Sequence, residues 1–190
     1  MSYYEQFYFS AQADNNKDTV TYGEGKHKDY WNPETMRYRL WDGRNKSMAW
    51  QKFNYLKLMD NKMSDVGRLL LLMQSIDYDN LICIYDKSIR KFRPIRNKEE
   101  LMQVVNYDIN SGQGRTFIKR LFGKDIVKKM IIIPNTEDQD KIERYFLNPI
   151  ITMREKGISI MCYKLFREHI IPFIPQRAIE NLDKHLLELE

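Results

Sequence analysis

Residues 81–148 constrain the fold most, because they carry the signals of a hairpin, two helices and a strand pair in that order. The segment 81–95 has an apolar first strand and a basic second strand that ends at Pro94, which predicts a β-hairpin. Asn97 then begins a short helix, in which Glu100 at the third position can complete a reciprocal cap. The first half of this region therefore predicts a hairpin that leads directly into a capped helix.

The second helix of this region is expected over 111–122, with Ser111 as its N-cap. At 100° per residue, its apolar residues fall on one arc: Phe117, Ile118, Leu121 and Phe122. Its polar residues fall on the opposite arc or its border: Gln113, Arg115, Thr116, Lys119 and Arg120. A helix that reads bases in the major groove needs one face that packs on the core and another that carries hydrogen-bond donors. The helix expected over 111–122 has both. An ordinary amphipathic surface helix is the alternative.

Gly112 and Gly114 at the start of this helix have low helix propensity. They would, however, let the backbone N–H groups there approach a phosphate closely.

Two β-rich runs, 126–133 and 142–147, follow this helix and are separated by a polar tip. A strand pair directly after two consecutive helices predicts a winged helix-turn-helix, and hence an α+β fold. Several basic residues of the pair could reach flanking phosphates: Lys128, Lys129, Lys141 and Arg144. Its tip carries Glu137, Asp138 and Asp140, which DNA would repel. The tip therefore either points away from the duplex or contacts a protein.

The charge distribution favours a nucleic-acid partner. Lys and Arg number 31 against 26 Asp and Glu, a net charge of +5. The excess is local, with basic clusters at 87–98 and 115–129 that contain a single acid, Asp125. A merely solvated surface is an equally good interpretation of the first cluster. The residues expected to contact DNA are Ser111, Gln113, Arg115, Thr116, Lys119, Arg120, Lys124, Lys128, Lys129 and Arg144.

A long helix is expected over 64–76, with Ser64 and Asp65 at its start. Its core residues should be Leu69, Leu72, Met73 and Ile76. The run of leucines predicts a helix that is covered on several sides. Ser47 can cap a further helix that runs to about residue 60.

The motif YFLNP at 145–149, before an apolar helix, is similar to the end of the winged-helix domain in replication initiators of Gram-positive plasmids and related phage-borne proteins. The helices 64–76, 97–105 and 111–122 match in order, so the resemblance covers roughly residues 47–170. It implies binding to double-stranded DNA by a transcription regulator or replication initiator of a phage or plasmid, with no chemistry of its own. A winged helix that binds a host or phage regulator is the alternative.

The rest of the chain divides into two further segments around the domain expected at 46–150. Residues 1–45 are expected to form an aromatic, β-rich extension, with strand-like runs at 19–22 and 36–41. It either packs on the main domain or orders on binding a protein partner. Residues 151–190 are expected to be helical, with an apolar stripe of Ile179, Leu182, Leu186 and Leu189. The stripe either packs on its own domain or forms the seam of a homodimer.

Other classes of protein lack support in the sequence. No run is apolar enough for a membrane span and no signal peptide is present, so a cytoplasmic protein is expected. Cys83 and Cys162 sit in apolar runs and should be buried and reduced. Zinc patterns, phosphate-binding loops and nucleophile elbows are absent, so we expect no cofactor, no metal and no enzymatic activity.

Overall fold

The computed structural model describes residues 30–32, 37–39, 54–132, 142–152, 157–174 and 176–187. It contains both helices and small antiparallel sheets, which confirms an α+β protein. The chain divides into two compact units. One is Leu56–Asn148, and the other is built from the two ends of the chain. Each is described separately below.

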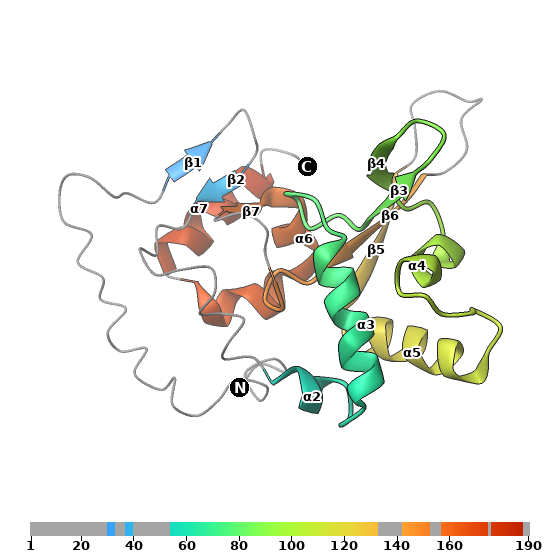
Figure 1. The fold of residues 1–190 in the computed structure, drawn as a ribbon. Coiled ribbons are helices and arrows are strands. Elements are labelled where there is room, and N and C mark those ends of the chain that lie inside the picture. Colours follow the sequence, from blue (N-terminus) through green and yellow to red (C-terminus); the bar gives the residue numbers. More distant parts are fainter. Residues whose placement is uncertain are drawn as a thin grey trace. The chain divides into compact units, whose positions relative to one another are not determined.

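The unit Leu56–Asn148 contains most of the described elements (Figure 1). Its helices are α2 (Tyr55–Leu58, whose first residue belongs to the other unit), α3 (Met63–Gln74), α4 (Lys98–Val104) and α5 (Gly112–Gly123). Its strands form two antiparallel pairs, β3 (Cys83–Asp86) with β4 (Lys91–Pro94) and β5 (Val127–Ile132) with β6 (Ile142–Leu147). The hairpin, the two helices and the strand pair therefore follow in the expected order.

A short segment before the hairpin lies along the free edge of β6. The backbone N–H of Ile82 donates to Tyr145 (2.8 Å), and that of Leu147 donates to Asn80 (2.9 Å). Asn80 adopts a positive φ of 60°, which asparagine tolerates better than most residues. Its buried side-chain amide also donates to the Leu147 carbonyl at 3.1 Å. Three chain segments thus run side by side in the order 80–82, β6, β5.

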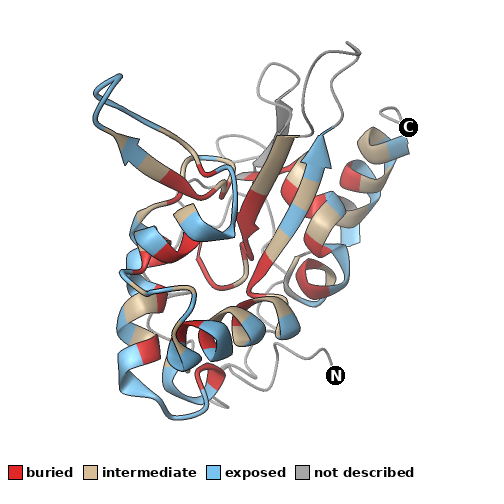
Figure 2. Cartoon of the chain, turned by 90° about the vertical axis from the view of Figure 1, so that its right-hand side faces the viewer, coloured by how far each residue is buried: buried red, intermediate tan, exposed pale blue. Residues whose placement is uncertain are grey.

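The core of this unit lies between α3, α4, α5 and the β5–β6 pair. Leu69, Leu72, Phe117 and Leu121 have no exposed surface, which confirms the prediction that all four are buried. Met73 and Ile76 are also buried, as expected. Figure 2 shows buried and exposed residues alternating along the helices. The prediction that α3 is covered on several sides is wrong, because Leu70 and Leu71 are 38% and 41% exposed.

Two of the predicted N-caps, those at Asn97 and Ser111, are confirmed. Asn97 accepts a hydrogen bond from the N–H of Glu100 (2.8 Å), and Ser111 accepts one from Gly114 (2.9 Å). The reciprocal half of the first cap differs from the prediction. The Glu100 carboxylate accepts from the N–H of Arg96 (2.8 Å), one residue before the cap, and it also binds Arg93 of the hairpin.

The second unit contains a three-stranded sheet in the order β1 (Tyr30–Asn32), β2 (Arg37–Arg39), β7 (Gly157–Ser159), all antiparallel. Three helical elements follow β7: α6 (Ile160–Ile170), the 3₁₀ helix η3 (Ile171–Phe173) and α7 (Gln176–Leu187). Gly157–Ser159, part of the segment 151–190 that was expected to be helical, is thus a strand. This strand pairs with β2, so the two ends of the chain share one sheet.

α6 and α7 are joined by a polar cluster around Asp183. Its carboxylate accepts from the hydroxyl of Tyr163 (2.7 Å) and from Arg167 (2.9 and 2.7 Å). Leu182 of the C-terminal stripe is fully buried, which favours packing on its own unit over a dimer seam for this residue.

Several expected features fall outside the described residues. They are the strand-like run 19–22, the Ser47 cap, Lys141 with the acidic tip of the strand pair, and Leu189. The proposed division at 1–45, 46–150 and 151–190 stays a prediction.

Candidate nucleic-acid interface

The solvent-facing side of α5 carries four of the expected contact residues. Gln113, Arg115, Thr116 and Lys119 are all exposed. The Thr116 hydroxyl donates to the Gly112 carbonyl one turn earlier (2.8 Å), which leaves its lone pairs open. Neither Arg115 nor Lys119 forms an ion pair with a described residue. This face therefore presents two available cations and two hydrogen-bonding side chains.

Arg120, which was expected on the same face, lies elsewhere. Its side chain is 7% exposed, and its guanidinium pairs with the carboxylates of Asp60 (2.7 Å) and Asp65. The expectation that Arg120 projects into solvent is wrong. It lies at the edge of α5 that faces Asp60 in the α2–α3 turn and Asp65 in the first turn of α3.

Lys124 joins the same ionic cluster. Its ammonium group donates to the Leu58 carbonyl (2.7 Å) and to the Asp60 carboxylate (2.5 Å). Asp60 has a positive φ of 53° in the turn after α2, and this turn directs its carboxylate toward α5. The hydrogen bond from Lys124 is the main cause that lowers the pKa of Asp60. Lys124 therefore holds α5 in place and is only partly available to a ligand.

Tyr107, in the loop between α4 and α5, extends this cluster. Its hydroxyl donates to Asp65 (3.1 Å), and the Arg68 guanidinium lies 3.6 Å from the centre of its ring. Burial and the bond to Asp65 raise the pKa of Tyr107. Its ring also lies 5.4 Å from that of Phe117. Charged groups of α3 and α5, together with the Tyr107 side chain of the loop, thus fix the orientation of α5.

The start of α5 is shaped by its own loop. The Ser111 hydroxyl accepts from Gly114 and donates to the Asp108 carbonyl (2.7 Å), so it is used by the cap. A Cβ on Gly114 would lie 2.1 Å from that same carbonyl. Gly114 is therefore needed for this loop contact rather than for approach to a phosphate. Gly112 has no atom within 4 Å of such a Cβ, so its expected role stays a prediction.

The basic residues of the β5–β6 pair are mostly engaged within the protein. Lys129 pairs with Glu143 at 2.7 Å and lowers the pKa of that carboxyl, and Lys128 lies 3.7 Å from Asp125. Arg144 donates to the Glu143 carbonyl (3.1 Å). These three side chains are only partly available for flanking phosphates.

The hairpin β3–β4 has features that the sequence analysis missed. Tyr85 is 49% exposed and Phe92 is 70% exposed, beside the basic turn 87–90. They pair across the strands, and their ring centres are 5.4 Å apart. The signal was present, because an aromatic residue sits in each strand, but only the basic residues were considered.

Metal and membrane sites find no support in the part of the chain that is described. There, no three His, Cys, Asp or Glu side chains gather in a way that could hold a metal ion. None of the helices in the same residues has the length and apolarity needed to cross a membrane. Cys83 and Cys162 are both buried, as predicted.

None of the family models, curated proteins or solved structures with which the chain was compared matches it.

Proposed function

We propose that Leu56–Asn148 is a winged helix-turn-helix that binds double-stranded DNA with α5 as its recognition helix. Two consecutive helices, α4 and α5, precede the antiparallel pair β5–β6, and the segment 80–82 is joined to the other edge of β6 by an isolated β-bridge between Leu81 and Phe146. This order of helices and strands supports the proposal. The β5–β6 pair would then be the wing.

The observation that carries the proposal is the difference between the two sides of α5. One side is fixed to the α2–α3 turn through Arg120 and Lys124. The opposite side leaves Arg115 and Lys119 exposed, and α5 contains no acidic residue. A recognition helix needs both properties, since base edges are read only when the helix is rigidly held and its donors are free.

The proposed activity is binding without bond-making chemistry. Arg115 and Lys119 would contact phosphates or guanine edges, while Gln113 and Thr116 could read neighbouring bases. In line with the resemblance noted in the sequence, the protein would act as a transcription regulator or replication initiator of a phage or plasmid. Both roles would use the same face.

The test is a titration of the full chain on duplex DNA from around its own gene, against scrambled duplex, at two salt concentrations. We expect tighter binding to the specific duplex and a decrease in log K of ~0.9 per phosphate contact for each tenfold rise in salt. Lys119→Ala and Arg115→Ala should each weaken duplex binding without changing the unfolding temperature. Lys184→Ala, which removes one exposed charge from α7, is the matched control. Equal binding by all three variants and the wild type would contradict the proposal.

A protein-interaction module is the second candidate. It is favoured by Ile131 and Ile132, which are 49% and 40% exposed at the outer end of β5. Apolar side chains in a row are more typical of a protein contact than of a phosphate contact. A chain that binds no duplex even at low salt would favour this second candidate.

A further inference from the structure

The hairpin β3–β4 presents two different faces because side chains alternate along a strand. The register pairs Ile84 with Arg93 and Tyr85 with Phe92, so Arg93 and Phe92 point to opposite sides. Arg93 binds both carboxylate oxygens of Glu100 on α4 at 2.8 Å. The Arg93 face is therefore tied to the helix, and the aromatic face is left outward.

The turn of the hairpin is held from within. One oxygen of the Asp86 carboxylate accepts from the N–H and the hydroxyl of Ser88 (2.9 and 2.6 Å). The other oxygen accepts from Nε of Arg93 (2.7 Å). A two-stranded hairpin is marginally stable alone, but this one is fixed at its turn and on its α4 side. The two rings are thus presented on an ordered support.

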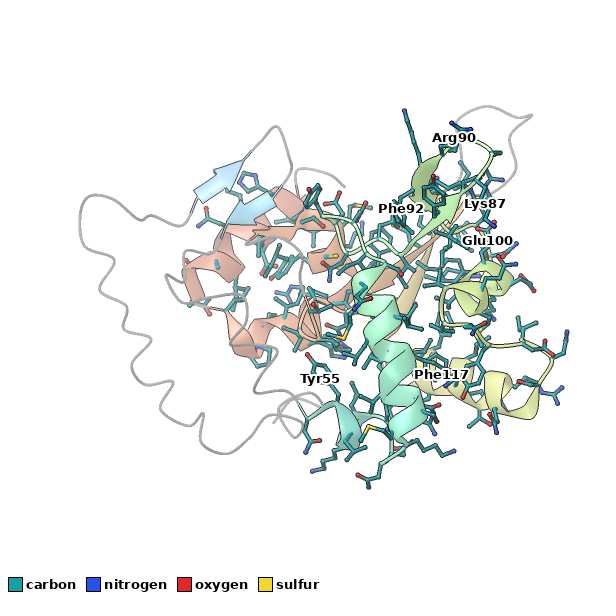
Figure 3. All side chains as sticks on the ribbon, viewed as in Figure 1. Tyr55, Lys87, Arg90, Phe92, Glu100 and Phe117 are labelled. Carbon is teal, nitrogen blue, oxygen red and sulfur yellow. The ribbon has the colours of Figure 1, made fainter. Side chains whose placement is uncertain are left out.

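Positive charge surrounds the aromatic face. Lys87 and Arg90 in the turn are both exposed, and no ion pair joins them to a residue described in the structure. Figure 3 shows Lys87, Arg90 and Phe92 on the projecting hairpin, with Glu100 on the helix below. The one acid of the hairpin, Asp86, is already bonded to Arg93.

We propose that this aromatic face binds single-stranded nucleic acid, with unpaired bases stacked on Phe92 and Tyr85 and phosphates bound by Lys87 and Arg90. Base stacking on exposed aromatic rings beside cations is the usual way in which proteins bind single strands without sequence preference. Paired bases in a duplex are stacked on each other and offer no open face to these rings. A second copy of the hairpin would bring like charges together, which disfavours self-association through this face.

This binding surface lies on the hairpin, so the inference does not depend on duplex binding by α5. The experiment is a fluorescence anisotropy titration of the full chain on a labelled oligothymidylate of about 12 nucleotides. The wild type should bind it at low salt, and Phe92→Leu should bind roughly 5- to 100-fold more weakly, because leucine keeps the apolar character but loses the π face. Phe92→Trp should restore binding. Phe92 is largely exposed, so none of these changes disturbs the core.

Three further measurements make the outcome specific. Duplex binding by Phe92→Leu should equal that of the wild type, and Lys119→Ala should leave single-strand binding unchanged. Sedimentation of Phe92→Leu should show the same mass as the wild type.

The inference is overturned if the wild type does not bind the oligothymidylate, even when duplex binding is intact. It is also overturned if Phe92→Leu binds the single strand like the wild type while Lys87→Ala weakens it, since binding would then be electrostatic only. Equal weakening of single-strand and duplex binding by Phe92→Leu would assign the hairpin to the duplex instead. A change in mass would assign it to self-association.

Discussion

The guanidinium of Arg120 on α5 is paired with the carboxylate of Asp65 on α3, and both side chains are almost completely buried, at 7% and 6% exposure. Asp65 also accepts from Tyr107, and Arg120 also pairs with Asp60. A buried charge is tolerated only when it is paired. This pair therefore decides whether α5 keeps its orientation, even though neither residue is on the exposed face of α5 that is proposed to contact DNA.

Removing one member of this pair should destabilise the protein strongly. Arg120→Ala leaves Asp65 buried without its main counter-charge, and we expect a loss of ~3–5 kcal/mol in the free energy of unfolding. Urea denaturation measures it. Lys119→Ala, one residue earlier but exposed, should change stability by less than ~0.5 kcal/mol.

The double variant Asp65→Leu with Arg120→Met tests whether the loss comes from leaving one charge buried without its partner. Replacing both charges by apolar side chains of similar size is often neutral, so most of the stability should return. Comparable stability of Arg120→Ala and the wild type would place this guanidinium in solvent and contradict the structure.

Two adjacent leucines of α3 should respond very differently to truncation. Leu72 is fully buried, so Leu72→Ala should cost ~2–5 kcal/mol through lost burial and a cavity. Leu71 is 41% exposed, and Leu71→Ala should cost under ~1 kcal/mol. Thermal or urea denaturation of both variants checks this. A reversed order of the two losses would mean that α3 is rotated about its axis.

The two glycines at the start of α5 form another matched pair. An added Cβ at 114 would lie 2.1 Å from the Asp108 carbonyl, so Gly114→Ala should cost ~1–3 kcal/mol as the loop moves away. Gly112 meets nothing within 4 Å, and Gly112→Ala should stabilise the helix by up to about 1 kcal/mol. Equal effects of the two substitutions on the unfolding midpoint would contradict this account of the loop.

Local signals in the sequence predicted the local structure well. The caps at Asn97 and Ser111 depend on residues three positions away, so the pattern alone identifies them. The burial and ion pairing of Arg120 could not be predicted from local signals. It lies beside Lys119 and has the same charge, but its partners Asp60 and Asp65 are 60 and 55 residues distant in the sequence.

The same limit applies to the strands at the ends of the chain. β7 was expected to be part of a helix, since apolar residues continue from it into α6. Its extended conformation depends on pairing with β2, more than a hundred residues earlier. Non-local pairing of this kind overrides local propensity.

The ion pair between Arg93 and Glu100, which ties the hairpin to α4, should make stability depend on pH. The hydrogen bonds from Arg93 lower the pKa of Glu100 below its value in the unfolded chain, which is about 4.3. A group with a lowered carboxyl pKa contributes stability that is fully present above the unfolded pKa and is lost as pH falls through the folded pKa.

Glu100→Gln removes this contribution. The difference in unfolding free energy between wild type and Glu100→Gln should therefore be constant from about pH 7 to about pH 5 and should shrink toward about pH 3. Urea denaturation across this range measures it, with the exposed Glu99→Gln as the control. A difference that does not change with pH would show that the carboxylate charge of Glu100 does not hold the hairpin.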